Sequence, residues 1–133
     1  MNTFEIRTGQ MLDADGKLIA TGYAGGACGQ YPDAVNNPAM CDRHGIGPLP
    51  PGLYRMGQPV DHSTLGPFAI PLTPDPSNQM YGRADFYVHG DAVGHPGAAS
   101  DGCIIMPREV RELLNQSQDR EIRVVSGINE GER

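Results

Sequence analysis

The stretch from Phe86 to Met106 reads F-Y-V-H-G-D-A-V-G-H-P-G-A-A-S-D-G-C-I-I-M. Its apolar beginning, Phe86 to Val88, is typical of a buried strand, and this run ends at His89 and a glycine. A loop rich in Gly, Ala and Pro then leads to Cys103, where apolar sequence resumes. The stretch therefore predicts one histidine at the end of a strand and one cysteine across a loop from it.

A histidine and a cysteine in this arrangement are suited to nucleophilic chemistry. A thiol attacks a carbonyl as its thiolate, so a nucleophilic cysteine needs a neighbouring base, and imidazole serves near neutral pH. The loop between His89 and Cys103 is long enough to bring the two side chains together. Gly102 leaves room for a substrate carbonyl and for backbone N–H groups that stabilise an oxyanion, and Ser100 either holds the turn or donates a hydrogen bond. Spacing alone is equally consistent with Cys103 as a small buried residue and His89 as a strand cap.

The length and composition of the chain indicate a single domain, and its charge argues against binding to nucleic acid. A chain of 133 residues suits one core, and 18 glycines with 12 prolines are typical of a loop-rich β protein. There are 10 basic against 16 acidic residues, with a net charge of -6 and no dense basic cluster, which argues against a nucleic-acid partner. The amino terminus lacks the pattern of a Sec signal peptide, and no run of apolar residues is long enough for a membrane span.

Local patterns predict a mainly β domain over 1–126 and a polar tail over 127–133. Strands are expected over 3–7, 10–13, 17–23, 53–56, 68–72, 85–89 and 121–125, the fifth of them an edge or bent strand because of Pro71. A helix is expected over 107–117; if Cys103 lies just before it, the helix dipole favours the thiolate. The long irregular segment 24–51 is interpreted as a flap or wall of a substrate cleft. The expected architecture is a small β-sandwich or barrel with one helix after Cys103.

Other polar residues leave several roles open. Arg83 is suited to bind a substrate carboxylate, or else forms an ion pair. His95 is an alternative base, and a zinc site with His89 and Cys103 would lack a fourth ligand, so we expect neither metal nor cofactor. Cys28 and Cys41 either form a disulfide, as in a periplasm, or stay free.

Several motifs resemble one enzyme family. The pattern V-H-G, a Gly/Pro loop and S-D-G-C-I-I-M is similar to the signature of the L,D-transpeptidase (YkuD-like) catalytic domain. The segments G-P-L-P-P-G-L-Y (47–54), L-T-P-D-P (72–76) and G-R-A-D-F-Y-V-H-G-D (82–91) resemble the small effector branch of that family, from type VI secretion. The likeness covers about residues 3–125. Asp101 stands where many members carry a second histidine, Ile105 stands where many carry arginine, and the loop before Cys103 is short, so substrate preference does not follow.

This resemblance implies a cysteine enzyme that modifies peptidoglycan. It implies Cys103 and His89 as catalytic residues, Gly102, Ser100, Gly90 and Asp101 as oxyanion or supporting residues, and Arg83, Tyr87 and His95 as substrate-binding residues. The implied substrate is a stem tetrapeptide, for L,D-carboxypeptidase, L,D-transpeptidase or D-amino acid exchange activity. The implied setting is an antibacterial effector made in the cytoplasm, delivered by a secretion system to the periplasm or cell wall of a target cell, with a cognate immunity protein. The alternatives are a housekeeping or phage wall enzyme and a non-catalytic wall-binding module.

Overall fold

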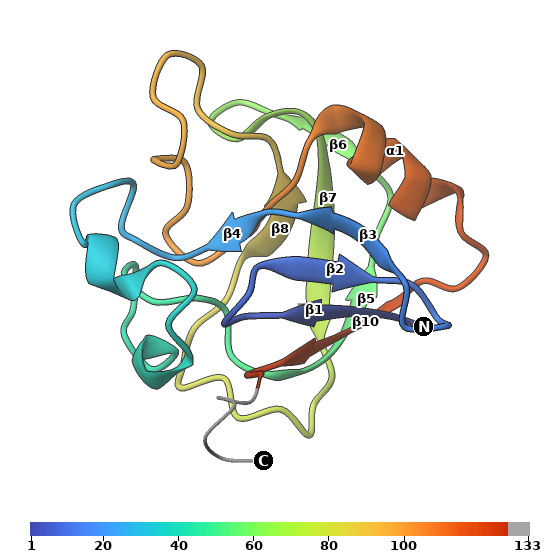
Figure 1. The fold of residues 1–133 in the computed structure, drawn as a ribbon, viewed down its shortest axis with the longest axis horizontal. Helices are drawn as coiled ribbons and strands as arrows, with labels where there is room; N and C mark the ends of the chain where they lie inside the picture. Colours follow the sequence, from blue (N-terminus) through green and yellow to red (C-terminus); the bar gives the residue numbers. More distant parts are fainter. Residues whose placement is uncertain (128–133) are drawn as a thin grey trace.

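The protein is mainly β, with strands that form one mixed, nearly closed, barrel-like sheet (Figure 1). The computed structural model describes residues 1–127. The strands are β1 (Asn2–Glu5), β2 (Gln10–Leu12), β3 (Leu18–Thr21), β4 (Tyr23–Ala24), β5 (Gly52–Met56), β6 (Val60–His62), β7 (Gly66–Pro74), β8 (Phe86–His89), β9 (Ile104–Ile105) and β10 (Glu121–Val125). One short α-helix, α1 (Arg108–Gln116), follows β9, and 3-10 turns lie at Pro32–Ala34 and Pro38–Met40. The mainly β class and the single helix after Cys103 are confirmed.

The sheet nearly closes because its two edge strands are consecutive in the chain. The strand order is β3-β2-β1-β10-β5-β7-β8-β9-β4, with β6 paired to β7, and only Gly22 separates β3 from β4. The Gly22 N–H donates to Gly9 O at 2.7 Å. A Cβ at Gly22 would lie 1.9 Å from Ile105 O, closer than atoms can approach, so the crossing from one edge to the other requires glycine.

The site strands lie in the middle of this sheet. β8 pairs antiparallel with β7 and parallel with β9, in a register that places Val88 beside Ile104 and His89 beside Ile105. Phe86 and Val88 belong to the buried core. Because side chains alternate along a strand, His89 is expected on the opposite face of β8 from Val88. The helix α1 contacts both β7 and β8.

Most strands lie where their patterns predict them, with three differences. The predicted strand 17–23 is split at Gly22 into β3 and β4, and the short strands β6 and β9 were not predicted. Of the two alternatives for Pro71, an edge strand or a bend, the edge strand is wrong, since β7 lies between β5 and β8. The chain accommodates Pro71 there because Gly57 N–H donates to its carbonyl, while Gly57 O accepts from Arg120 instead of from the missing proline N–H.

The helix forms where it is predicted, with Pro107 and Ser117 as its caps. Its buried side chains are Val110, Arg111 and Leu114. β9 and Met106 separate Cys103 from the helix, and the Met106 N–H donates to His89 O. Cys103 therefore does not lie just before the helix, and the condition for an effect of the helix dipole on its thiolate is not met.

The irregular segment 24–51 packs against the barrel. Ala34, Cys41 and Leu49 are buried, and Leu49 N–H donates to Gly102 O at 2.9 Å. The segment therefore supports the loop of the candidate nucleophile from behind. Of the predicted polar tail, 127–133, all but Gly127 lies outside the described residues.

Candidate active site

His89 is held as a neutral base. Its Nδ1 lies 2.9 Å from Gly90 O, and because a carbonyl only accepts, Nδ1 carries the ring hydrogen. Nε2 then keeps its lone pair. Burial lowers the pKa of His89 below its ordinary value. The hydrogen bond to Gly90 partly offsets this shift, and the nearby charge of Arg111 adds to it. The carbonyl of Gly90 is therefore the group that orients the ring.

His89 Nε2 is also the one buried side-chain N or O atom, within residues 1–127, that has no hydrogen-bond partner. The whole residue is 2% exposed. Buried polar atoms are nearly always paired, and exceptions tend to mark functional positions. An unpaired imidazole nitrogen with a free lone pair is ready to accept a proton from a group that moves next to it.

Cys103 lies beside the amino-terminal half of β8. Extending the β8–β9 register by one residue places it next to Tyr87, two residues before His89. Its sulfur contacts Asp85 O at 4.0 Å. Burial raises the pKa of Cys103 to about 12, although the Tyr87 N–H and the Arg83 charge act in the opposite direction. At neutral pH the thiol is therefore protonated and the resting pair is uncharged.

Cys103 Sγ and His89 Nε2 are not hydrogen-bonded to each other. Two residues along a strand correspond to about 6.6 Å. In proteins without substrate, catalytic hydrogen bonds are often long and tighten only in the complex. The two residues thus lie on adjacent strands, but their side chains are not hydrogen-bonded to each other.

Ser100 organises the turn before the cysteine. Its hydroxyl is fully buried, donates to Cys103 O at 2.6 Å and accepts from Gly102 N–H at 3.0 Å and Gly25 N–H at 2.8 Å. Ser100 therefore both holds the turn and donates a hydrogen bond. This arrangement also means that the Gly102 N–H is not free for an oxyanion, contrary to the expectation.

Gly102 is needed for packing as well as for access. Its φ is +149°, and a Cβ there would lie 2.7 Å from Arg83 Nη2 and 2.8 Å from the Phe86 ring. A side chain at this position would displace both groups. The glycine before the cysteine therefore lets Arg83 and Phe86 pack directly beneath the turn.

Arg83 is a buried structural residue. Nη1 donates to Cys41 O and Pro48 O, both at 2.7 Å. Nη2 donates to Gly47 O at 2.9 Å and Asp101 O at 3.2 Å. Both terminal nitrogens are therefore occupied by main-chain carbonyls. Arg83 forms no ion pair within the described residues, so neither the expected ion pair nor a free carboxylate-binding fork is present.

A cleft of about 570 Å³ opens beside His89. Its walls come from the β6–β7 turn, the loop after β8, the turn before Cys103, Cys28 and the helix. They include Thr64, Leu65, Gly66, Pro67, His89, Gly90, Asp91, Ala92, Val93, Ala99, Asp101 and Arg111. Asp101 also borders a second hollow of about 400 Å³ that contains Arg83 and Asp85. Asp101 thus forms the rim between the two hollows.

The remaining predicted substrate contacts lie outside the cleft walls. Tyr87 packs edge-to-face on His62, with ring centroids 5.3 Å apart. His95 lies exposed in the loop after β8 and lines neither hollow. The loop itself is held by Asp91, which accepts from the hydroxyl of Tyr23 at 2.6 Å and from Gly97 N–H. This anchor was not predicted.

All three cysteines are free thiols in this structure, so Cys28 and Cys41 are not bridged. Cys41 is buried, whereas Cys28 is exposed and lines the cleft. Within residues 1–127, no group of three or more His, Cys, Asp or Glu side chains is placed to hold a metal ion. The described helices also include none long and apolar enough to cross a bilayer.

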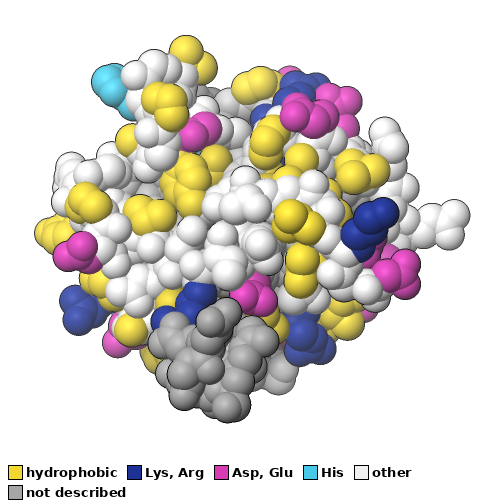
Figure 2. All heavy atoms as spheres, in the orientation of Figure 1, with side chains coloured by type: hydrophobic (Ala, Val, Ile, Leu, Met, Phe, Trp, Pro, Cys, Tyr) yellow, Lys and Arg dark blue, Asp and Glu magenta, His cyan; other side chains and the backbone are white. Residues whose placement is uncertain are grey.

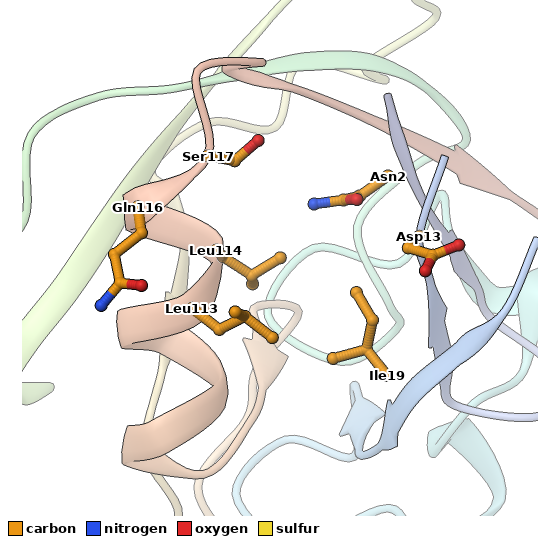
Figure 3. Close-up of a pocket in the computed structure, with 7 residues that line it drawn as sticks. All are labelled: Asn2, Asp13, Ile19, Leu113, Leu114, Gln116 and Ser117. Atoms are coloured by element: carbon orange, nitrogen blue, oxygen red, sulfur yellow. The ribbon is translucent and has the colours of Figure 1, made fainter. Parts of the chain in front are cut away.

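A further hollow of about 350 Å³ lies between α1 and the amino-terminal strands (Figure 3). Leu113 and Leu114 of α1 face Ile19 of β3 across it, and Asp13 lies at its side. It contains none of the predicted site residues. On the face shown in Figure 2, Lys and Arg side chains are scattered and do not form a stripe.

Comparison with known proteins assigns the chain to a family. The family model described as the Tlde1 domain matches residues 25–127, which include every predicted site residue. Neither the curated proteins nor the solved structures include a match to this chain. The chain belongs to the Tlde1 domain family, the L,D-transpeptidase effector domains of type VI secretion.

Proposed function

We propose that the protein is a cysteine-dependent enzyme that cleaves or exchanges the terminal residue of peptidoglycan stem tetrapeptides, with Cys103 as nucleophile and His89 as base. The observation that carries this proposal is the oriented, neutral and unpaired imidazole of His89 at the wall of a cleft, one strand away from Cys103. Membership of the Tlde1 family supports the same chemistry and the same substrate class.

The first half-reaction forms a thioester. Cys103 Sγ attacks the carbonyl between the L-centre of diaminopimelate and the terminal D-alanine while His89 Nε2 takes the thiol proton. The tetrahedral intermediate collapses, the C–N bond breaks, and His89 returns that proton to the leaving amine. D-Alanine departs and the tripeptide remains bound to the sulfur. A neutral thiol and a neutral imidazole are the protonation states that this step requires.

The second half-reaction depends on the acceptor. Water hydrolyses the thioester and yields a tripeptide, an amine of another stem yields a cross-link, and a free D-amino acid yields an exchanged tetrapeptide. His89 removes a proton from the acceptor in each case, and the thiol is regenerated. Because the Gly102 N–H is bonded to Ser100, the Cys103 N–H remains as the candidate oxyanion donor from this turn.

Peptidoglycan cleavage is tested with purified muropeptides and mass spectrometry. The wild-type protein should convert tetrapeptides to tripeptides or altered dimers, and Cys103→Ala should abolish the change. Cys28→Ala is the matched control, because Cys28 is the exposed thiol of the same cleft and has no proposed part in the reaction. A Cys103→Ala protein as active as the wild type would refute the assignment of the nucleophile.

The proposed setting is delivery to the periplasm of a target cell, with a cognate immunity protein in the producer. Expression directed to the periplasm should be toxic for the wild type and harmless for Cys103→Ala, whereas a housekeeping or phage wall enzyme would be tolerated. The immunity protein should co-purify with the wild-type protein.

A non-catalytic wall-binding module is the second candidate, because Cys103 is only 3% exposed and is not hydrogen-bonded to His89 Nε2 in this structure. Such a module would bind peptidoglycan and leave muropeptide masses unchanged. Mass spectrometry of the intact protein after exposure to a carbapenem separates the two candidates, since an enzyme of this class would gain an acyl group at Cys103.

A further inference from the structure

Arg111 is a buried cation in the wall of the cleft that contains His89. It is the fourth residue of α1, and its side chain is 6% exposed. Nε donates to Met106 O at 3.1 Å, and Nη1 donates to Pro67 O at 2.8 Å and Phe68 O at 3.0 Å. Three hydrogen bonds from two nitrogens fix the plane of the guanidinium.

The third nitrogen of this guanidinium, Nη2, remains unused. Within residues 1–127 it has no hydrogen-bond partner, and no carboxylate lies within ion-pair distance of Arg111. A Cβ added to Gly90 would lie 2.8 Å from Nη2, so this nitrogen borders the backbone that directly follows His89. The glycine keeps the space in front of Nη2 open.

The two buried arginines of the site differ in this respect. Arg83 donates from both Nη1 and Nη2 to four carbonyls and has no terminal nitrogen left for a ligand. Arg111 is equally buried but leaves one terminal nitrogen free. Because His89 Nε2 is the one buried side-chain nitrogen or oxygen without a partner in residues 1–127, Nη2 of Arg111 is accessible from outside, and a guanidinium N–H group binds a carboxylate strongly.

The other charges at the cleft leave this position to a ligand. Asp91 is occupied by Tyr23 and by the N–H groups of its own loop. Asp101 lines the cleft but forms no ion pair with Arg111. Among the charged side chains of the helix, Arg108 pairs with Glu112 at 3.1 Å.

In the proposed reaction, His89 gives a proton to the amine of the leaving D-alanine. The carboxyl carbon of that residue lies about 2.5 Å from the amine nitrogen, so the carboxylate must also lie close to His89. We propose that Arg111 Nη2 binds the terminal carboxylate of the stem peptide and thereby restricts the enzyme to peptides with a free carboxyl terminus directly after the scissile bond. This inference rests on the proposed function.

The test compares one tetrapeptide as its free acid and as its C-terminal carboxamide. The wild type should prefer the free acid by about 10- to 100-fold in kcat/KM, as expected for a charge-assisted hydrogen bond. Arg111→Met should reduce the ratio to about one, through a higher KM for the acid, and Arg111→Lys should restore part of it. Arg108→Met, an exposed arginine on the same helix, is the control and should keep the wild-type ratio.

The outcomes separate this inference from the proposed function. A wild type that cleaves neither peptide overturns the proposed function and this inference with it. A wild type that cleaves both peptides at similar rates overturns the inference alone, and so does an Arg111→Met protein that keeps the preference. The comparison of the two peptides with the wild type needs no variant, and the Arg111→Lys protein keeps the role of this residue testable if Arg111→Met fails to fold.

Discussion

Replacing Arg83 by methionine should destabilise the protein strongly, because the site is built around this guanidinium. The change removes four hydrogen bonds to the carbonyls of Cys41, Gly47, Pro48 and Asp101. Hydrogen bonds from a charged donor contribute about 1.5–3 kcal/mol each, or about 6–12 kcal/mol in total. The cost of burying a cation without a carboxylate offsets several kcal/mol of this sum, so we expect a net loss of about 3–5 kcal/mol.

Thermal unfolding followed by circular dichroism measures this loss. For a domain of this size, 3–5 kcal/mol corresponds to a decrease in Tm of about 12–20 °C. Arg108→Met is the control, since its exposed pair with Glu112 contributes about 0.5 kcal/mol or less. If Arg83 instead bound substrate, replacing it would raise KM and leave Tm unchanged. An Arg83→Met protein with the Tm of the wild type would therefore refute the structural role.

Three further predictions concern Cys103, His89 and the crossing between the edge strands at Gly22. Because burial raises the pKa of Cys103 to about 12, iodoacetamide should label Cys103 more slowly than the exposed Cys28 at pH 8 and progressively faster as the pH rises; peptide mapping that finds Cys103 fully labelled first would contradict this. Because burial lowers the pKa of His89, the neutral base should persist to acidic pH, and the acidic limb of the pH profile of kcat/KM should have its midpoint below pH 6.5. A midpoint above pH 6.5 would refute the lowered pKa of His89. His89→Ala should reduce kcat by about 100- to 10,000-fold. Gly22→Ala, at the crossing from β3 to β4, should lower the free energy of unfolding measured in urea by about 1–3 kcal/mol. Gly57→Ala is the control and should change it little, because its added Cβ would lie an ordinary 3.4 Å from Pro71. Equal stabilities of the two variants would show that the crossing does not require glycine.

Local patterns were sufficient for the elements that carry the site. The apolar alternation around Val88, the spacing of Val110 and Leu114, and the strand at Glu121–Val125 all correspond to elements of the fold. The candidate pair, His89 and Cys103, was found from spacing and from motif resemblance. These features depend on neighbours in sequence, so periodicity and motif can identify them.

The supporting contacts were not predictable, because their partners are distant in sequence. Arg83 bonds carbonyls 35, 36 and 42 residues away, and Arg111 bonds carbonyls 43 and 44 residues away. A carbonyl belongs to every residue, so no side-chain pattern marks it as a partner. The same reason explains why Pro71 suggested an edge strand: the replacement donor, Arg120, is 63 residues from Gly57.

The way the two arginines are bound also has an electrostatic consequence. The segment 101–106 contains Cys103, and both of its ends are held by a buried guanidinium, Asp101 O by Arg83 and Met106 O by Arg111. A carbonyl satisfies the donors of a guanidinium without cancelling its charge, whereas a carboxylate would neutralise it. The segment that contains Cys103 is therefore anchored at both ends by a guanidinium that keeps its positive charge. The Arg83 charge lowers the pKa of Cys103, although the Asp101 carboxylate and above all burial act in the opposite direction. In the proposed reaction the two guanidinium groups favour the oxyanion and the substrate carboxylate, and they do so before substrate binds.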